Sequence, residues 1–273
     1  MNIFIVGLGL MGASYAEALS QKGYAVDGFD QDLITLEKAR QDNIIQTGSL
    51  SALTQADVVI LALYPKDNVN FVQSHQHLFR KNQLVTDISG TKVDVVSSIE
   101  SILPEGVGYV SHHPMAGRAL SGYDHRKPSM FQGANFIIIK TDDSQATHIS
   151  TIERLATDLG FNHVMVLDPK THDQLIAYTS QLTHVLAVAL MHMDTFKDTP
   201  KATGDSFREL TRIAHINENM WTELFFENKI YLKEAINHMI EELKSIDDML
   251  EKDAKVPLKT YLKNAKEKRK QFD

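Results

Sequence analysis

The sequence predicts an α/β chain, in which a doubly wound, mainly parallel sheet is followed by an all-helical domain. Three observations predict this class. Over the first two thirds, short β-rich runs alternate with segments of helical periodicity. A glycine-rich turn follows the first run directly, and no convincing strand follows Asp168-Pro169. We therefore expect two domains, 1–167 and 168–273, and at 273 residues the chain is long enough for both.

The alternating part contains seven β-rich runs and five helical segments. We expect strands at 3–6, 25–29, 58–61, 84–86, 109–110, 136–139 and 164–166. We expect helices at 10–22, 33–41, 68–77, 93–102 and 145–159. This order is that of consecutive βαβ units, which build a parallel sheet covered by helices on both faces.

The second part begins where Asp168 and Pro169 form a helix start, because Asp is a good N-cap and Pro suits the first helical position. Apolar periodicity predicts helices at 170–196, 205–215, 218–227, 229–252 and 256–269, with a break at Thr199-Pro200. Such helices form a bundle whose exposed apolar stripe a second subunit covers. The sequence therefore predicts a homodimer that associates through the helical domain.

The composition is that of an ordinary globular protein, with 43% hydrophobic and 23% charged residues. The formal net charge of −7 argues against a nucleic-acid binder. No uninterrupted apolar run has the length of a membrane span, and residues 2–7 already have the pattern of a strand, which leaves no room for a cleavable signal. The absence of cysteine fits a reducing compartment. We expect a cytoplasmic protein without membrane or nucleic-acid partners.

Two further features have ordinary explanations. Between Lys252 and Lys270 there are eight Lys or Arg and two acids, which fits a solvated helix with a cationic C-terminal end. Two segments with possible metal ligands, His75-Gln-His77 and Met191-His-Met193, lack the spacing and the carboxylates of a metal site. The sequence therefore predicts no metal.

A dinucleotide-binding motif opens the chain. Its residues are Gly7, Leu8, Gly9, Leu10, Met11 and Gly12. They follow the first strand and begin a helix, as a Rossmann-type domain requires, so the helix N-terminus can receive a pyrophosphate. Asp30, at the end of the second strand, is placed to accept hydrogen bonds from the adenosine ribose and to repel a 2′-phosphate. We therefore expect NAD rather than NADP.

The most informative segment is 111–123, which places His113 beside a proline in a glycine-rich loop. A neutral imidazole there can take a proton while a nicotinamide takes a hydride. The segment therefore indicates dehydrogenation of an alcohol.

Four blocks together resemble the prephenate dehydrogenase family. They are the glycine motif at 7–12, the 113–117 loop with Ser121-Gly122, the stretch from His172-Asp173 to His184, and 206–214, followed by a related segment at 220–229. The resemblance implies oxidative decarboxylation of prephenate to 4-hydroxyphenylpyruvate with NAD, a step of tyrosine biosynthesis. Hydride leaves the ring carbon that bears the hydroxyl, and loss of the ring carboxylate completes aromatisation.

The resemblance also implies roles for single residues. His113 matches the catalytic histidine, and Arg212 matches an arginine that binds a substrate carboxylate, for which a planar guanidinium is suited. His184 matches a second histidine that contacts the substrate, with Ser180 as a companion, although Gln181 and Thr183 replace the family's usual His and Pro. His112 has no matching role and is expected to be structural.

Two departures from the family pattern lie close to His113. Many members have a serine that orients the catalytic histidine, and this chain has Gly90 there, so Ser89 or Thr91 is expected to supply the hydroxyl. Many relatives also have an acid where this chain has Ala119, and Arg118 precedes it, which predicts a more cationic substrate pocket.

Three alternatives stay open at the level of sequence. Arogenate dehydrogenase shares the fold and the chemistry, and differs by an amino group on the substrate. A β-hydroxyacid dehydrogenase also carries such a glycine motif and ends in helices, but does not account for His113-Pro114 with Arg212. A non-catalytic NAD-binding regulator would tolerate the altered positions.

Overall fold

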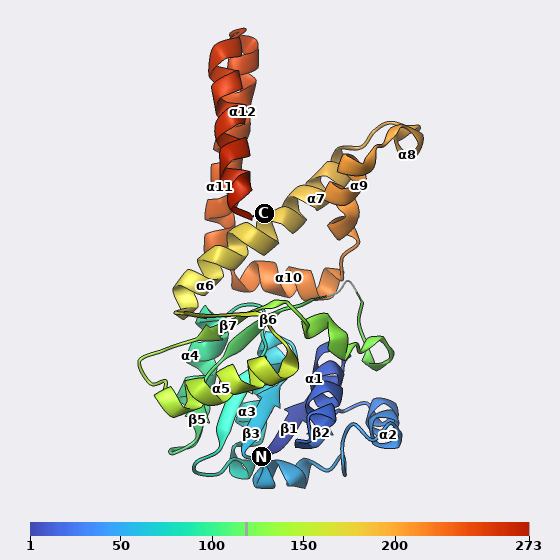
Figure 1. Cartoon of the computed structure of the whole chain (residues 1–273), viewed down its shortest axis with the longest axis vertical. Helices are drawn as coiled ribbons and strands as arrows, with labels where there is room; N and C mark the ends of the chain where they lie inside the picture. Colours follow the sequence, from blue (N-terminus) through green and yellow to red (C-terminus); the bar gives the residue numbers. More distant parts are fainter. Residues whose placement is uncertain (118–119, 273) are drawn as a thin grey trace.

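A parallel five-stranded sheet with helices on both faces forms the N-terminal part of the molecule (Figure 1). The computed structural model describes residues 1–117 and 120–272. The strands pair in the order β2-β1-β3-β4-β5, with bounds β1 Asn2–Val6, β2 Ala25–Phe29, β3 Val58–Leu61, β4 Leu84–Asp87 and β5 Gly108–Tyr109. The helices between them are α1 Leu10–Gln21, α2 Leu33–Gln41, α3 Pro65–Ser74 and α4 Val93–Ile102. The predicted doubly wound sheet is confirmed.

Alternate side chains of β1 enter two hydrophobic cores, one on each face of the sheet. Ile3 and Ile5 pack with residues of α1 and of α5 (Ala146–Leu159), whereas Phe4 and Val6 pack with residues of α3 and α4. A parallel sheet buried on both faces leaves its C-terminal edge for binding, because the loops that follow parallel strands all meet there.

The remaining strands form a separate three-stranded sheet rather than extending the first one. Its strands are β6 His112–Met115, β7 Asn135–Ile139 and β8 His163–Leu167. β6 pairs antiparallel with β7, and β7 pairs parallel with β8. The sequence predicted a loop around His113, but this residue lies on β6 opposite Ile137. The short run at 112–115 contains a proline and has no alternating pattern, so its strand character comes from pairing with β7.

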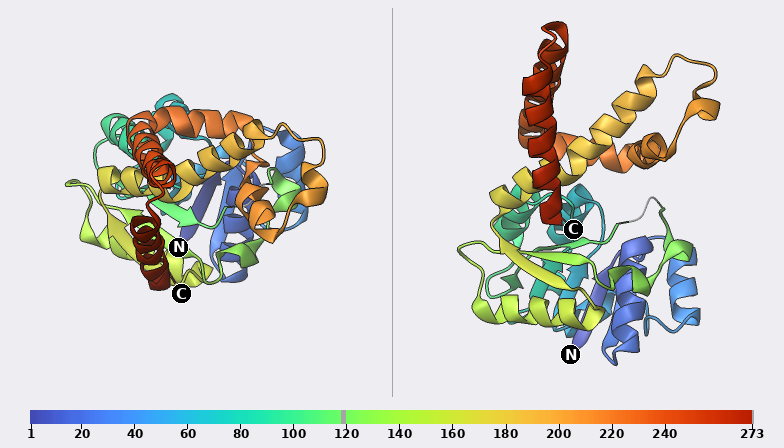
Figure 2. Two further views of the ribbon diagram at one scale, coloured as in Figure 1. Left: turned by 90° about the horizontal axis from the view of Figure 1, so that it is seen from above. Right: turned by 45° about the horizontal axis from the view of Figure 1, so that its top comes forward.

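The second part of the chain is helical throughout, as predicted. Its elements are α6 Pro169–Ile176, the π-helical turn η5 Ala177–Gln181, α7 Leu182–Met193, α8 Thr199–Ala202, α9 Asp205–Thr211, the 3-10 turn η6 Arg212–Ala214, α10 Glu218–Glu227, α11 Lys229–Glu251 and α12 Lys255–Arg269. α10 lies across the top of the α/β part, and α11 and α12 form a hairpin that projects away from it (Figures 1 and 2).

One helix is long and apolar enough to cross a membrane by length and composition alone. It runs from Pro169 to Met193, with a mean hydropathy of 1.2 and 28% of its most apolar window buried. The sequence prediction counted only uninterrupted apolar runs and missed this segment. His172 and Asp173 of the same helix are buried and form hydrogen bonds to the α/β part. This anchoring is typical of a helix that packs at a domain junction.

Candidate active site

The glycine motif forms a close-packed turn between β1 and α1. Gly7 has a φ of +89°, and a Cβ there would lie 2.9 Å from the carbonyl oxygen of Ala62. A Cβ on Gly12 would lie 1.8 Å from the carbonyl oxygen of Gly7, whereas one on Gly9 would meet nothing within 4 Å. Gly7 and Gly12 are therefore required by packing. Gly9 leaves open space beside the backbone, which a pyrophosphate needs.

The N-terminus of α1 has the features of an anion site. Gly9 is its N-cap, and no side chain caps the helix. Leu8 and Leu10 are buried, and Met11 packs against the core, so these three residues offer the helix terminus only their backbone. The amides at the N-terminus of α1 are suited to a phosphate because they point outward from a helix end.

Asp30 lies beside this turn at the end of β2. One carboxylate oxygen accepts a hydrogen bond from the backbone N–H of Leu8 at 2.8 Å, and the other accepts one from Asp32 at 2.9 Å. The side chain is half-buried, so its outer lone pairs can accept from ribose hydroxyls. Asp32 caps α2 through Ile34 and Thr35, as the sequence predicted.

The predicted base, His113, is the first of three side chains joined in a row by hydrogen bonds. Nδ1 of His113 lies 2.9 Å from Nε2 of His172, and Nδ1 of His172 lies 2.7 Å from Oδ1 of Asp173. His113 is partly buried, and His172 is fully buried on α6. Burial, reinforced by the nearby Lys92 cation, holds the pKa of His113 well below its ordinary value. His113 is therefore neutral and able to accept a proton at physiological pH.

A buried ion pair lies directly behind His113. Nζ of Lys92 donates to Asp87 at 3.0 Å, to the Ser111 hydroxyl at 2.6 Å and to the carbonyl of His112 at 2.8 Å. Both Lys92 and Asp87 are fully buried. The pKa of Asp87 is lowered, because its ion pair with Lys92 and its hydrogen bonds outweigh the effect of burial. Lys92 thus joins the C-terminal end of β4 to the start of β6.

His112 has a structural role, as predicted. One ring nitrogen lies 3.0 Å from the Tyr15 hydroxyl and the other 2.6 Å from the Thr86 hydroxyl. The ring stacks on Phe136, with a centroid distance of 4.7 Å. Burial lowers the pKa of His112 to about 3, so the ring is a neutral member of the core.

The two hydroxyls expected near His113 are bonded to other groups. The Ser89 hydroxyl accepts from Asn68 at 3.1 Å, and the Thr91 hydroxyl donates to Glu227 at 2.6 Å. Neither forms a hydrogen bond to His113 in the part of the chain that the structure describes. A Cβ on Gly90 would lie 3.3 Å from Leu224 of α10, so the space at this position is largely filled from the helical domain.

A second cluster lies about three turns further along the helix that carries His172. The ring of His184 lies against that of Trp221, with centroids 3.7 Å apart and the planes tilted by 30°, and its Nδ1 lies 2.9 Å from the carbonyl oxygen of Ser180. Ser180 lies in the π-helical turn η5, and such turns are frequent at functional sites. Burial lowers the pKa of His184. The turn η6, which carries Arg212, packs against α7, so Arg212 belongs to the same cluster.

Arg212 is the cation of this second cluster. It is exposed on η6 and has no ion-pair partner among residues 1–117 and 120–272. An exposed guanidinium without an internal partner is available to a carboxylate ligand. No hydrogen bond or ring contact between described residues joins this cluster to His113.

The positions at which this chain departs from the family pattern differ in their surroundings. Gln181 is buried and donates to the carbonyl of Leu224 at 3.0 Å, so it holds η5 to α10, whereas Thr183 is exposed. Arg118 and Ala119 lie outside the described residues. Among the residues that the structure does describe, no group of three His, Asp or Glu side chains could hold a metal ion.

The sequence predicted no role for four residues of the site: His172, Asp173, Lys92 and Trp221. His172 and Asp173 were noted only as part of a block that resembles the family. Adjacent His and Asp near a helix start is a usable signal, since the two side chains can form a hydrogen-bonded pair beside that helix end.

Two domain descriptions from one family cover almost the whole chain. The nucleotide-binding domain of prephenate dehydrogenase matches residues 15–165, and the dimerization domain of prephenate dehydrogenase matches residues 168–264. The chain belongs to the prephenate dehydrogenase family. Membership, predicted from four sequence blocks, is confirmed. It makes the chain a dehydrogenase and removes the β-hydroxyacid dehydrogenase alternative.

Individual relatives agree with this assignment. The chain is 27% identical to prephenate dehydrogenase of Bacillus subtilis, over 98% of this chain and 75% of the relative. It is 27% identical to cyclohexadienyl dehydrogenase of Zymomonas mobilis, over 90% of this chain and 87% of the relative. The structure resembles prephenate dehydrogenase of Aquifex aeolicus, solved with hydroxyphenyl propionate and NAD+, with a TM-score of 0.90, 29% identity and coverage of 100% and 98% of the two chains.

Proposed function

We propose that this chain oxidises prephenate to 4-hydroxyphenylpyruvate and carbon dioxide, with NAD as the hydride acceptor. The observation that carries the proposal is His113, a neutral imidazole held by its Nδ1 against His172 at 2.9 Å. Its Nε2 is thereby left for a substrate hydroxyl. The relatives from Bacillus subtilis and Aquifex aeolicus, both named prephenate dehydrogenases, support this substrate.

His113 moves one proton twice in this reaction. Its Nε2 takes the proton of the ring hydroxyl while hydride leaves the ring carbon that bears this hydroxyl. Loss of the ring carboxylate as carbon dioxide then makes the ring aromatic, and His113 returns the proton to the oxygen. Atoms and charge balance without net uptake or release of a proton, since one hydride leaves with NADH and one carbon dioxide is lost. A neutral histidine with a lowered pKa suits this role, because it binds no proton beforehand.

The second cluster is suited to the anionic end of the substrate. Arg212 offers two parallel N–H groups to a carboxylate, and prephenate has two carboxylates. We propose Arg212 as the carboxylate clamp and His184 and Ser180 as further contacts. Because Nδ1 of His184 donates to the Ser180 carbonyl, its Nε2 is an acceptor or, when protonated, a donor toward the substrate.

Three further predictions from the sequence, two about site residues and one about the domain boundary, remain proposals. Ser89 and Thr91 would contribute a hydroxyl near His113 only if substrate or cofactor binding released them from Asn68 and Glu227. Arg118 is proposed to add positive charge to the substrate pocket. The domain boundary is proposed at 167/168, between β8 and the Asp168 cap of α6.

The residues around the glycine turn fit NAD. Bound NAD supplies the hydride acceptor, which the side chains of this protein cannot provide. The open space at Gly9 and the uncapped N-terminus of α1 receive the pyrophosphate, while Asp30 accepts from the adenosine ribose. A 2′-phosphate would bring negative charge against the Asp30 carboxylate, so NADP is disfavoured.

A side-by-side assay tests substrate and cofactor together. Purified protein is mixed with prephenate or arogenate and with NAD or NADP, and NADH absorbance and carbon dioxide are recorded. We expect the highest kcat/KM for prephenate with NAD. A preference for arogenate would keep the reaction and replace the substrate. No turnover of either substrate between pH 6 and 10 would favour a non-catalytic NAD-binding regulator.

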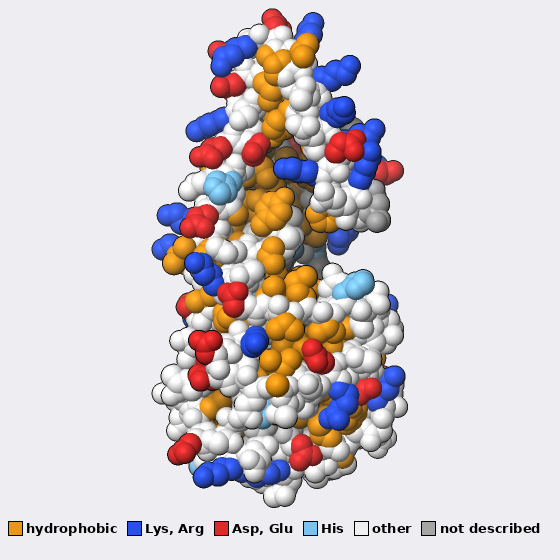
Figure 3. Space-filling model, turned by 60° about the vertical axis from the view of Figure 1, so that its left-hand side comes forward, with side chains coloured by type: hydrophobic (Ala, Val, Ile, Leu, Met, Phe, Trp, Pro, Cys, Tyr) orange, Lys and Arg blue, Asp and Glu red, His pale blue; other side chains and the backbone are white. Residues whose placement is uncertain are grey.

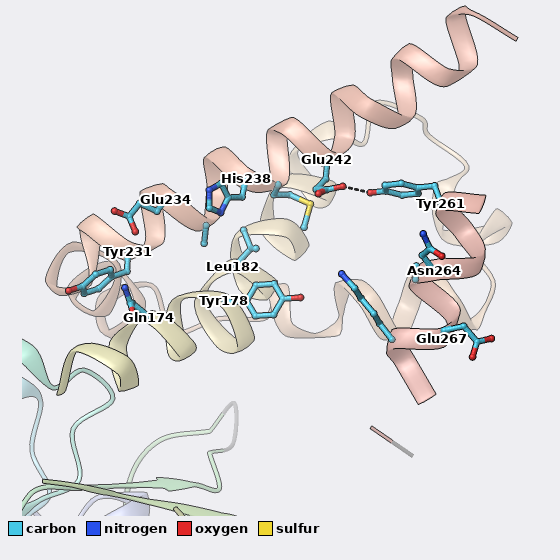
Figure 4. Close-up of a pocket in the computed structure, with 14 residues that line it drawn as sticks. Gln174, Tyr178, Leu182, Tyr231, Glu234, His238, Glu242, Tyr261, Asn264 and Glu267 are labelled. Atoms are coloured by element: carbon cyan, nitrogen blue, oxygen red, sulfur yellow. Dashed lines mark hydrogen bonds between the residues drawn. The ribbon is translucent and has the colours of Figure 1, made fainter. Parts of the chain in front are cut away.

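We also propose a homodimer that acts in the cytoplasm in tyrosine biosynthesis. A groove of about 910 Å³ lies between the α6–α7 helix and the α11–α12 hairpin, lined by Tyr178, Leu182 and Met239 among others (Figure 4). Hydrophobic side chains gather along this hairpin (Figure 3), including Leu243 and Leu250, which are 55% and 59% exposed. The matching dimerization domain supports a second copy as the occupant.

The oligomeric state tests this interface. Sedimentation of the full chain is expected to give a dimer, and Leu243→Asp is expected to shift it toward monomer because a buried unpaired charge is costly. Thr260→Asp, a polar position on α12, serves as the control. A wild-type chain that stays monomeric at micromolar concentration would refute the homodimer.

A further inference from the structure

We propose that His172 and Asp173 are positioning residues, which fix the tautomer and the orientation of His113. The inference rests on the proposed function for its catalytic meaning, but the tautomer itself can be measured without substrate. The inference rests on three side chains joined by hydrogen bonds. Because Asp173 can only accept, the donor and the acceptor of each hydrogen bond in the row can be assigned in turn.

Asp173 is an acceptor in all its contacts. Its Oδ1 accepts from the backbone N–H of Lys92 at 2.8 Å, and its Oδ2 accepts from that of Val93 at 2.9 Å. The same Oδ1 lies 2.7 Å from Nδ1 of His172. A carboxylate that already accepts from two amides cannot donate, so Nδ1 of His172 must carry the proton. The carboxylate therefore selects one tautomer of His172.

That choice is passed on to His113. Burial lowers the pKa of His172, so the ring is neutral, and its second nitrogen, Nε2, can only accept. Nε2 of His172 lies 2.9 Å from Nδ1 of His113, which must then be the donor. A neutral His113 with its proton on Nδ1 has a lone pair on Nε2. This is the form that a general base needs.

The same elements also hold the backbone of His113. Asp173 anchors the N-terminus of α4 through the amides of Lys92 and Val93. Nζ of Lys92 in turn donates to the carbonyl of His112, the residue before the base. The side chain and the backbone of His113 are thus both tied to the N-terminus of α4. Lys92, His112 and Asp173, which make these contacts, are fully or almost fully buried.

No other side chain in the described part of the chain forms a hydrogen bond to His113. The nearest candidate hydroxyls, those of Ser89 and Thr91, are bonded to Asn68 and Glu227. The rings of His113 and His172 are tilted by 57° with centroids 5.1 Å apart, so they do not stack. The single hydrogen bond that His113 donates to His172 is therefore what orients the base.

A purely structural role for Asp173, as a cap of α4, makes a different prediction. If Asp173 only caps α4, the carboxylate is needed for folding, but loss of the contact between His172 and His113 changes neither the tautomer of His113 nor turnover. Two variants of His172 separate the roles. Asn at 172 can still reach Asp173 but is too short for His113, whereas Gln can place an oxygen where Nε2 of His172 lies. His172→Asn therefore keeps the cap and removes the contact, and His172→Gln restores an acceptor.

The first measurement is the tautomer of His113 in the substrate-free protein, from ¹⁵N spectra of histidine-labelled chain, with His113→Asn to assign the signal. We expect a protonated Nδ1 and a bare Nε2 in the wild type and in His172→Gln. A mixture of tautomers is expected in His172→Asn. Protonated Nε2 in the wild type, or an unchanged spectrum in His172→Asn, would overturn the proposal.

The second measurement is turnover against pH. His172→Asn is expected to lower kcat by up to about 10⁴-fold, the loss that a wrong tautomer of the catalytic histidine causes in serine proteases, with partial recovery in His172→Gln. The acid limb of the profile should move to lower pH in His172→Asn, because the protonated form of His113 loses the neutral acceptor of its Nδ1–H. If the wild type has the expected tautomer but does not turn over prephenate, the proposed function fails and the positioning role stands.

Discussion

The ammonium group of Lys92 donates a hydrogen bond to the carbonyl oxygen of His112 at 2.8 Å, directly before the predicted base. This contact joins the N-terminus of α4 to the start of β6. Since Lys92 is also paired with Asp87 at 3.0 Å, a buried charge stabilises the strand that presents His113. The strand that presents the predicted base therefore depends on a fully buried ion pair.

Lys92→Met tests this ion pair. The substitution leaves the buried Asp87 carboxylate unpaired, and we expect a loss of about 3–5 kcal/mol in the free energy of unfolding, measured in urea. The double variant Lys92→Met/Asp87→Asn should recover part of the loss, because no uncompensated charge remains. Lys252→Met removes an exposed pair with Asp248 and is expected to cost under about 1 kcal/mol. A similar small cost for Lys92→Met would contradict the assignment.

His113→Asn removes the predicted base. Turnover of prephenate should fall by about 10²–10⁴-fold, the usual contribution of a general base, while NAD affinity stays close to that of the wild type. The NAD dissociation constant is followed by calorimetry and kcat by NADH absorbance. His163→Asn, an exposed position on β8, is the matched control. Near-normal turnover of His113→Asn would remove His113 from its role.

Arg212→Gln removes the proposed carboxylate clamp. Charge-assisted hydrogen bonds are worth about 1.5–3 kcal/mol, so the KM for prephenate should rise about 10–100-fold with a smaller change in kcat. Lys201→Gln removes an exposed cation of α8 and serves as the control. A pure loss of kcat with an unchanged KM would argue against a clamp that acts in the ground state.

Glu227→Gln tests a pH dependence at the contact between α10 and the α/β part. Burial, with a smaller contribution from Glu223, raises the pKa of Glu227 to about 7 from an ordinary value of 4.5. A raised carboxyl pKa gives stability that is fully present below about pH 4.5 and is lost as pH rises through 7.

The variant should therefore match the wild type near pH 5 and be more stable near pH 8. We expect a gain of about 1 kcal/mol in urea unfolding at the higher pH, since the half-exposed site is partly screened by solvent. Glu218→Gln, at the start of the same helix, should show no such divergence. An equal effect of Glu227→Gln at both pH values would rule out this titration.

Much of the candidate site was predictable because its signals are local. The glycine turn, Asp30 and His113 lie in short segments whose residue types and spacing indicate their chemistry. The hydroxyl expected beside His113 was not predictable in the same way. Which of Ser89 and Thr91 faces the histidine depends on the groups around them, and Asn68 and Glu227, far away in the chain, are the bonded partners.

By itself the sequence determined the α/β alternation, the helical second part and the nucleotide turn, and it singled out His113 as the candidate base. These follow from local periodicity, capping residues and turn chemistry, which act over a few residues. Only the tertiary structure decided that His113 lies on a strand opposite Ile137, and that His172 lies against its Nδ1. Contacts across 24 and 59 residues leave no local pattern, since they depend on which buried donors find acceptors once the domains have packed.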